Sequence, residues 1–247
     1  MAKEEQNQEP ETLLQTVKSN LKTIGWAIVI AGIIRSLLFE PFHIPSSSMK
    51  DTLLIGDYII VSKSSYGYSK YSFPFAMLPF KGRVLSKQPE RGDVAVFRLP
   101  SNPRINYIKR IVGVPGDEIQ MVNGQLYLNH SPIPKIYDSE FVGERGKITK
   151  YKETLPNGKS YYVLDQVTNA LKDNTPVYTV PPGYYFFMGD NRDNSQDSRY
   201  LSKVGFISEE HLIGKAKFIF MSSNDSLFKF WFWWKNIRFS RIFDKIH

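Results

Sequence analysis

Three consecutive serines, Ser46, Ser47 and Ser48, lie between Pro45 and Met49, directly after the longest apolar run of the chain. A serine hydroxyl is inert until a neighbouring base removes its proton, and that base is normally a histidine or, alternatively, a lysine. Serines that follow a proline also commonly form a solvated turn. The stretch is therefore either a polar linker or a candidate nucleophile, and the choice depends on whether the chain holds a suitable base.

Lys109 is the candidate base because of the segment that contains it, INYIKRIVGVPGDEI, residues 105 to 119. On a β-strand, Lys109 shares one face with Tyr107, whereas Arg110 shares the other face with Ile108. If both faces are covered, a charge must be desolvated; arginine keeps its proton, but a buried lysine can lose it. Lowering a lysine pKa from about 10.4 to about 8 requires roughly 3 kcal/mol, within the range known for buried groups. The alternative is a strand whose two cationic groups both reach water.

The sequence argues against most other catalytic centres. The chain has no cysteine, which excludes disulfides, thiol nucleophiles and thiolate metal sites. His43, His130, His211 and His247 form no H-E-x-x-H or paired ligand spacing, and no G-x-S-x-G, Walker or G-x-G-x-x-G motif occurs. The acidic run GDNRDNSQDSR, residues 189 to 199, lacks the glycine and glutamate that a calcium loop needs at its sixth and twelfth positions. We therefore expect no metal and no cofactor, and a serine–lysine pair is the hydrolytic centre that the sequence permits.

The elements that must position these residues are mostly strands. The 247 residues suffice for one large or two modest domains, and 42% hydrophobic residues are ordinary for a globular core. After Pro45, seven segments alternate with period two or form short apolar runs between turn residues. They are 53–63, 91–100, 105–114, 117–129, 159–165, 175–190 and 214–222, with an Asn-Gly hairpin at 122–125 and a short helix that starts at Ser208. The expected fold is mostly β and mostly antiparallel.

An apolar helix precedes the serines. Residues from Leu13 onward are helical in character, and 21–39 form a stretch of 19 residues if Arg35 snorkels to the headgroups, close to the roughly 20 that a membrane span needs. We expect a transmembrane anchor at 21–40, with residues 1–20 in the cytoplasm because Lys18 precedes the span and Lys22 lies at its very start. A cleaved signal peptide and a buried core helix are the alternatives, although no A-x-A cleavage site follows the span.

The net charge of +8 and the sequence pI of about 9.4 fit either nucleic acid or an anionic membrane surface. Six of the seven residues at 228–234 are aromatic, and 228–247 hold five Lys and Arg against one Asp. Aromatic rings with nearby cations suit the headgroup region of a bilayer, although a packed strand would bury the same rings. With the anchor, this tail (227–243) favours a phospholipid bilayer as partner. No nucleic acid is expected, since a module for it needs a basic stripe with base-stacking aromatics.

Four boxes, in the same order, resemble bacterial type I signal peptidases: PSSSM followed by TLLIGDYIIV, then RGDVAVF, YIKRIVGVPGD and GDNRDNSQDSR. The resemblance extends from about Phe39 to Met221, and the boxes are specific as a set. It implies a membrane-bound serine endopeptidase that removes signal peptides from exported preproteins at the outer face of the bacterial inner membrane. It also implies two antiparallel β subdomains, a catalytic one from 41–115 and 182–247, and an inserted one that fits the more polar stretch 116–181.

The resemblance assigns roles to residues of this sequence. Ser48, directly before the methionine of the first box, corresponds to the nucleophile and Lys109 to the general base. Ser46 would supply a hydroxyl to the oxyanion hole beside the Ser48 N–H, and Ser195 would hydrogen-bond and orient the lysine. The supporting ion pairs would be formed by Asp190, Asp197, Arg110 and Arg199. The shallow apolar pockets for the small side chains of an Ala-x-Ala motif would be lined by Phe42, Ile44, Pro45, Met49, Leu53, Tyr107 and Ile108.

Three positions depart from the family pattern. Ser47 stands where glycine is common, and Asp51 stands where proline is frequent, which predicts a looser turn. After Arg199 the run YLSKVGFIS is longer than the usual Y-W-G-F-V, so the local loop must differ. Two other functions fit parts of the sequence: a membrane-anchored β adaptor that docks through its aromatic tail, and a Ser-Lys autoprotease of the repressor type. The second would lack an anchor and would carry a DNA-binding domain.

Overall fold

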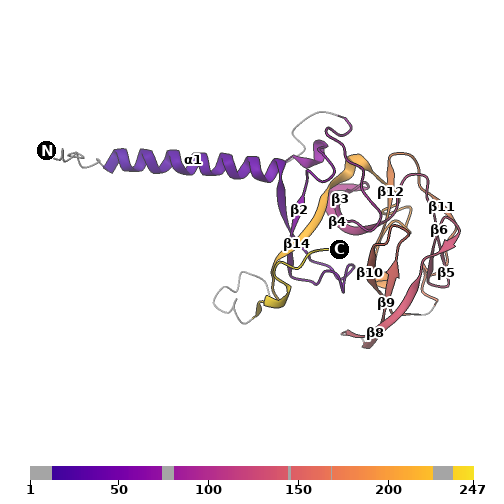
Figure 1. The fold of residues 1–247 in the computed structure, drawn as a ribbon. Coiled ribbons are helices and arrows are strands. Elements are labelled where there is room, and N and C mark those ends of the chain that lie inside the picture. The colour runs from indigo at the N-terminus through magenta and orange to yellow at the C-terminus, as the bar shows by residue number, and fades with distance from the viewer. Residues whose placement is uncertain (1–12, 74–80, 144–145, 168, 225–235) are drawn as a thin grey trace, which may run out of the picture.

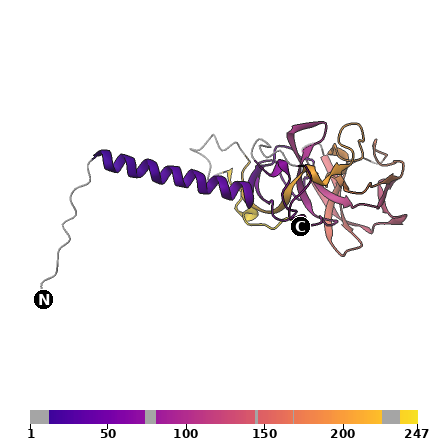
Figure 2. The ribbon, with the colours of Figure 1, turned by 90° about the horizontal axis from the view of Figure 1, so that it is seen from above.

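The computed structural model describes residues 13–73, 81–143, 146–167, 169–224 and 236–247. Its first element is a long helix, α1 (Leu13–Leu37), which projects away from a β-rich body (Figures 1 and 2). Within it, Leu13–Arg35 is long and apolar enough to cross a membrane, with a mean hydropathy of 1.3, and none of it is buried by the rest of the protein. The buried core helix, one alternative from the sequence, is therefore wrong. The helix begins eight residues before the predicted span 21–40 and ends three residues before its end.

Polar contacts join the end of α1 to the body. The Tyr68 hydroxyl donates to the Leu37 carbonyl (2.5 Å) and the Lys63 N–H donates to the Leu38 carbonyl (3.0 Å), so two carbonyls at the helix end are satisfied. The Glu40 carboxylate pairs with the buried Lys63 ammonium (2.8 Å) and with Arg35 at the end of α1 (3.3 Å). These contacts hold the helix at the start of the first strand.

A seven-stranded antiparallel sheet forms the larger part of the body. Its order is β1-β2-β14-β3-β4-β12-β13. The strands are β1 (Phe39–His43), β2 (Asp57–Ser62), β3 (Val94–Leu99), β4 (Asn102–Gly113), β12 (Tyr184–Met188), β13 (Ile207–Ser208) and β14 (Leu212–Ser222). The chain therefore leaves this sheet after β4 and returns to it at β12, which brings residues far apart in sequence to neighbouring strands (Figure 1).

The residues between β4 and β12 form two smaller sheets. One has the order β11-β5-β6-β7 and the other β10-β9-β8, both antiparallel. The strands are β5 (Glu118–Val122), β6 (Gln125–Leu128), β7 (Ser131–Pro132), β8 (Lys135–Gly143), β9 (Gly146–Thr154), β10 (Ser160–Asp165) and β11 (Tyr178–Thr179). The predicted hairpin at 122–125 is confirmed: Asn123 and Gly124 have φ of 50° and 74°, as a tight turn requires.

Five strands were not predicted: β1, β7, β8, β9 and β13. β7 and β13 have two residues each and are too short to show alternation. The sequences of the other three explain why they were missed. β1 contains Pro41, which lacks an N–H, but β1 is an edge strand and pairs only with β2 within the described residues. β8 and β9 form a long hairpin whose sequence, KIYDSEFVG and GKITKYKET, carries charges on both strands and has little apolar alternation. The predicted short helix after Ser208 is confirmed as a 3₁₀ turn, Glu209–His211.

The core divides into three clusters of buried side chains. One lies within the smaller sheets and reaches the large sheet at Val112 and Phe186. A second cluster packs Met49 and Leu53 against β2 and β14, and a third surrounds Phe97 and Phe187. The second cluster therefore supports the segment that follows the three serines.

The aromatic run of the C-terminal tail, 228–234, lies outside the described residues. From 236 onward the chain packs back on the body. Arg238 and Arg241 pair with the buried Asp57 carboxylate at 3.2 Å and 2.7 Å, and Ile246 is buried in the cluster that supports the serine segment.

Candidate active site

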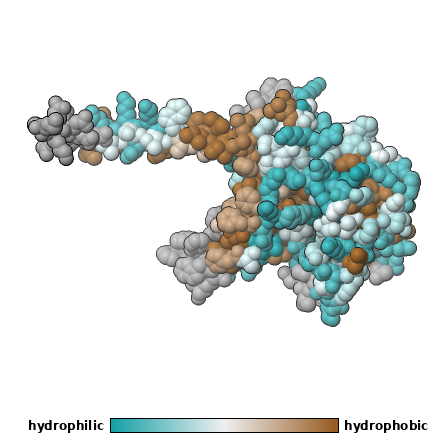
Figure 3. Space-filling model, in the orientation of Figure 1, coloured by the Kyte–Doolittle hydropathy of each residue, from teal (hydrophilic) through white to brown (hydrophobic). Residues whose placement is uncertain are grey.

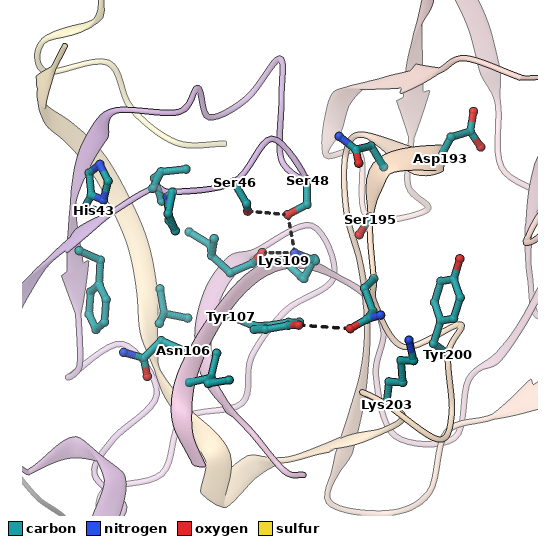
Figure 4. A pocket seen from close by; sticks show the side chains of 18 residues that line it. His43, Ser46, Ser48, Asn106, Tyr107, Lys109, Asp193, Ser195, Tyr200 and Lys203 are labelled. Carbon is teal, nitrogen blue, oxygen red and sulfur yellow. Dashed lines mark hydrogen bonds between the residues drawn. The ribbon is translucent and has the colours of Figure 1, made fainter. Parts of the chain in front are cut away.

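A pocket of about 650 Å³ opens between the end of β1, the exposed half of β4 and the segment 193–203 (Figure 4). Several residues that the sequence singles out lie on its surface, and Ser48 and Lys109 lie close together within it. The predicted residues that line it are Phe42, Ile44, Pro45, Ser46, Ser48, Tyr107, Ile108, Lys109 and Ser195. The fold thus joins two segments about sixty residues apart, as a serine–lysine pair requires.

The serine segment is fixed by contacts on both of its sides. Its own turn is closed by the Lys50 N–H, which donates to the Ser47 carbonyl at 3.0 Å. From the opposite side, the Asn191 N–H donates to the Ser48 carbonyl and its side-chain amide donates to the Ser47 carbonyl, both at 3.1 Å. This close approach requires Gly189, because a Cβ there would lie 2.6 Å from the Ser48 carbonyl oxygen. The position of Ser48 is therefore set by the segment 189–194 as well as by its neighbours in sequence.

Lys109 lies on β4, between β3 and β12, and only 4% of it is exposed. Its Nζ lies 2.6 Å from Ser48 Oγ and 3.0 Å from the Ile108 carbonyl oxygen. Burial lowers the pKa of Lys109 to about 8, although the carboxylates of Asp197 and Asp190 act in the opposite direction. A substantial neutral fraction near physiological pH can therefore accept a proton from the serine hydroxyl.

Two hydrogen-bond donors lie next to the Ser48 hydroxyl. The Ser46 hydroxyl lies 3.3 Å from Ser48 Oγ, where either oxygen can donate. The Ser48 N–H donates to no acceptor among the described residues, so it is available to a ligand in the pocket. Two such donors are what the carbonyl oxyanion of a tetrahedral intermediate bound to Ser48 would need.

Two buried ion pairs support the site. Arg110, on the opposite face of β4, is 1% exposed and binds the Asp190 carboxylate through two nitrogens at 2.8 Å and 2.7 Å. Arg199 binds the Asp197 carboxylate, which lowers the pKa of Asp197 although burial alone would raise it. Both carboxylates are held in buried ion pairs, and their charge favours the ammonium form of Lys109, which partly offsets the effect of its burial.

The family model for signal peptidase, peptidase S26, matches residues 17–221 of the chain. The chain belongs to this family. It is 43% identical over 253 residues to the signal peptidase I of Rickettsia typhi, which covers 94% of this chain and 95% of that protein. The signal peptidase I of Rickettsia felis is 43% identical over 231 residues, covering 90% of this chain and 84% of that protein. A crystal structure of a signal peptidase I from Enterococcus faecalis V583 shares 28% identity over 52% of this chain and 97% of that chain, with a TM-score of 0.32.

Membership of the signal peptidase family confirms the resemblance that the sequence boxes predicted, and makes the chain a serine hydrolase. The family supports cleavage of signal peptides from preproteins by a serine protease. The apolar helix α1 fits a membrane-anchored member of the family.

Two features of this signal peptidase differ from the predicted site. Ser195 lines the pocket and is buried, and its side chain is among the groups that hold the pKa of Asp197 down, but no hydrogen bond joins its Oγ to Lys109. The predicted bond from Ser195 to Lys109 is therefore not formed, because the amine is directed to Ser48 and to the Ile108 carbonyl. Met49 and Leu53 were predicted to line the substrate pockets. Both are fully buried in the core cluster beneath the site and do not reach the pocket surface.

The two substitutions in the family pattern near the nucleophile have direct structural consequences. Asp51 has φ of +86°, a left-handed conformation that proline cannot adopt, and its carboxylate pairs with Lys150 of β9 at 3.0 Å. The turn is thus held by an ion pair rather than loosened. Ser47 Oγ accepts a hydrogen bond from the Asn194 side-chain amide at 2.7 Å, which adds a contact that glycine would lack.

Other residues of the pocket were not predicted. Asn106 directly precedes Tyr107, and Gln196 directly follows Ser195. Tyr200 and Lys203 belong to the loop that departs from the family pattern. Asn191, which holds the serine segment, lies inside the GDNRDNSQDSR box. A departure in loop length was the one signal in the sequence that pointed to the wall formed by Tyr200 and Lys203.

Proposed function

We propose that this chain is a membrane-anchored endopeptidase that cleaves signal peptides from exported preproteins after an Ala-x-Ala-type motif, with Ser48 as nucleophile and Lys109 as general base. The observation that carries the proposal is the 2.6 Å contact between Ser48 Oγ and the Nζ of a buried lysine whose pKa is lowered to about 8. Among the described residues, His43 is the one histidine that lines the pocket, and its ring packs against Tyr58 at a tilt of 44° with the ring centroids 4.8 Å apart.

In the first step, Ser48 Oγ attacks the carbonyl carbon of the scissile bond while neutral Lys109 accepts the hydroxyl proton. The carbonyl oxygen becomes an oxyanion, which the Ser48 N–H and the Ser46 hydroxyl would stabilise as donors. When the intermediate collapses, the C–N bond breaks and the Lys109 ammonium returns its proton to the departing amine. The departing amine becomes the new N-terminus of the mature protein.

The signal peptide then remains attached to Ser48 as an ester. A water molecule attacks the ester carbonyl while Lys109 again accepts a proton, and collapse releases the carboxylate of the signal peptide. The returning proton restores the Ser48 hydroxyl, so the enzyme is regenerated with no net change. Because Lys109 is packed on β4, its amine stays beside Ser48 Oγ, where it can accept a proton first from the serine hydroxyl and then from the attacking water.

The preference for small side chains follows from the pocket wall formed by β1 and β4. Phe42, Ile44, Pro45, Tyr107 and Ile108 line it, while Met49 and Leu53 fill the space beneath. Ile44 is almost completely buried, so only part of this apolar wall is open to a ligand. An apolar wall packed from beneath would accommodate alanine and reject larger side chains by steric overlap.

The surface next to the anchor supports a bilayer as partner. Leu37, Leu38 and Phe39 are between 39% and 45% exposed, and the apolar surface of α1 continues onto the body in the space-filling view (Figure 3). With Lys18 and Lys22 near the start of the helix, the N-terminus would lie in the cytoplasm and the β body at the outer face of the bacterial inner membrane. The junction at Glu40 and Lys63 would then hold the pocket close to that surface.

The test is cleavage of a purified preprotein by the detergent-solubilised full chain, with the cut located by mass spectrometry. We expect one cut, directly after a small-x-small motif at the end of the signal peptide. The Lys109→Ala variant should fold, as judged by its circular dichroism and thermal unfolding, and should show no detectable cut. Absence of cleavage by the wild-type chain, or a cut away from small residues, would contradict the proposal.

A further inference from the structure

The pocket has two walls of different chemistry. One wall comes from β1, β3 and β4 and is mainly apolar; it includes Phe42, Ile44, Val96, Ile105, Tyr107 and Ile108. The other comes from the single segment 193–203 and is polar; it includes Asp193, Asn194, Ser195, Gln196, Tyr200 and Lys203. In Figure 4, Ser48 and Lys109 lie between His43 on one side and Asp193, Tyr200 and Lys203 on the other. A ligand that crosses Ser48 therefore meets an apolar wall on one side and a polar wall on the other.

The end of the polar wall is an ordered turn. The Tyr200 carbonyl accepts the N–H groups of Lys203, Val204 and Gly205 at 2.9 to 3.2 Å. Gly205 has φ of +60°, which glycine adopts without strain, and Val204 is buried in the core. The Ser101 hydroxyl donates to the Lys203 carbonyl at 3.0 Å, so the turn is also tied to the β3–β4 hairpin. The backbone of Lys203 is thus fixed while its side chain extends into the pocket (Figure 4).

The charges on this wall are not balanced. Lys203 has no carboxylate partner among the described residues, and its side chain is exposed. The carboxylate of the same wall, Asp193, accepts two hydrogen bonds from the N–H groups of Gln166 and Val167, at 2.6 Å and 2.9 Å. A second cation, Lys172, lies over the Tyr200 ring at 4.7 Å from its centroid. The Tyr200–Lys203 end of the wall is therefore cationic and unpaired.

We propose that Lys203 is a specificity-determining residue that favours an acidic side chain in the substrate segment following the scissile bond. This inference rests on the proposed function, in which the segment before the bond occupies the apolar wall. An extended peptide advances about 3.3 Å per residue. With the segment before the scissile bond on the apolar wall, the first few substrate residues after the bond would pass the opposite wall, where Lys203 lies. An acidic side chain there gains a partner for the unpaired ammonium, whereas a basic side chain is repelled by it.

The expected effect is that of a partly exposed ion pair, about two- to fivefold in kcat/KM between an acidic and a neutral residue. Because the ammonium is exposed, the preference should weaken as salt is raised above about 0.5 M, where screening acts over a few ångströms. Lys203 changes neither the bond that is cleaved nor the residues that cleave it, so its effect is on substrate recognition alone.

The test uses the full chain in detergent and a set of preproteins that share one signal peptide and differ only after the cut. Asp, Gln or Lys is placed in turn at each of the first four mature positions, and kcat/KM is measured for each. Wild type should favour Asp over Lys at one or two of these positions, Lys203→Gln should lose the preference, and Lys203→Glu should reverse it. Lys87→Glu makes the same change of net charge at an exposed lysine outside the pocket and should keep the wild-type preference.

The outcomes separate the two proposals. Efficient cleavage with equal Asp and Lys rates at all four positions, or the same ratio in wild type and Lys203→Glu, overturns the role of Lys203 alone. A reversal that Lys87→Glu also produces overturns it in favour of long-range electrostatics. No cleavage of any substrate by the wild-type chain overturns the proposed function and this inference with it.

Discussion

The pH dependence of cleavage is a direct consequence of the burial of Lys109. Burial lowers the pKa of this amine from 10.5 to about 8, a difference of about 3 kcal/mol between its two protonation states. At pH 7 about a tenth of the enzyme then holds the neutral base, compared with about 0.03% for an ordinary lysine. The structure thus makes the base roughly three-hundredfold more available at neutral pH.

The assay is kcat/KM for a substrate with no group that titrates between pH 6 and 9, since kcat/KM reports the pKa values of the free enzyme. We expect the rate to rise about tenfold per pH unit below pH 7, to level off above about pH 9 and to be about ninetyfold higher at pH 9 than at pH 6. Lys109→Arg keeps a positive charge but cannot release its proton, and should lose at least about a hundredfold at every pH.

Two results would refute this reasoning. An acid limb near pH 6.5 would indicate a histidine as the base, and a rate still rising steeply at pH 10 would indicate an unperturbed lysine. Full activity of Lys109→Arg would exclude a role for the neutral amine.

Three further predictions concern stability. Between pH 8 and 10.5 the folded protein binds fewer protons at Lys109 than the unfolded chain, so the free energy of unfolding should rise with pH across that range. At pH 7 the buried ammonium opposes folding, and Lys109→Met should therefore raise the free energy of unfolding, measured by urea titration, by up to about 3 kcal/mol. An equal or lower free energy of unfolding in Lys109→Met would contradict a cost of burying the ammonium. Arg110→Ala leaves Asp190 buried without its partner and should cost about 3–5 kcal/mol by the same measurement; a cost below about 1 kcal/mol would show that the pair is not needed. Asp51→Pro is incompatible with φ of +86° and should lower the melting temperature, whereas Asp51→Gly should be tolerated; equal melting temperatures would argue against the left-handed turn.

Much of the fold followed from local pattern, and particular strands show why. In β4 the adjacent Lys109 and Arg110 each stood in an apolar row, so a sheet covered on both faces had to bury a charge, and both residues are at most 4% exposed. The Asn-Gly pair specified the β5–β6 hairpin because both residues accept positive φ. The β8–β9 hairpin gave no such signal, since its stability comes from pairing and from contacts with the body rather than from alternation.

The site was predicted only where sequence neighbours and the family resemblance both pointed to it. Ser48 and Lys109 are brought together by the β1–β4 arrangement, which neither segment specifies alone. The sequence placed Met49 and Leu53 in the substrate pockets, but both side chains face the core, where they pack against β2 and β14. Lys203 could not be assigned to the pocket because the run after Arg199 differs in length from the family pattern, so the path of this loop could not be predicted from the sequence.

If one of the three adjacent serines attacks the substrate, a series of single variants should identify it. Cleavage of one preprotein should be measured under single-turnover conditions for Ser46→Ala, Ser47→Ala and Ser48→Ala, each checked for native folding. We predict no cleavage by Ser48→Ala, a loss of about 10²–10³ for Ser46→Ala as an oxyanion donor, and less than about a tenfold loss for Ser47→Ala, whose hydroxyl only accepts from Asn194. Cleavage by a folded Ser48→Ala at more than a trace of the wild-type rate would contradict the account.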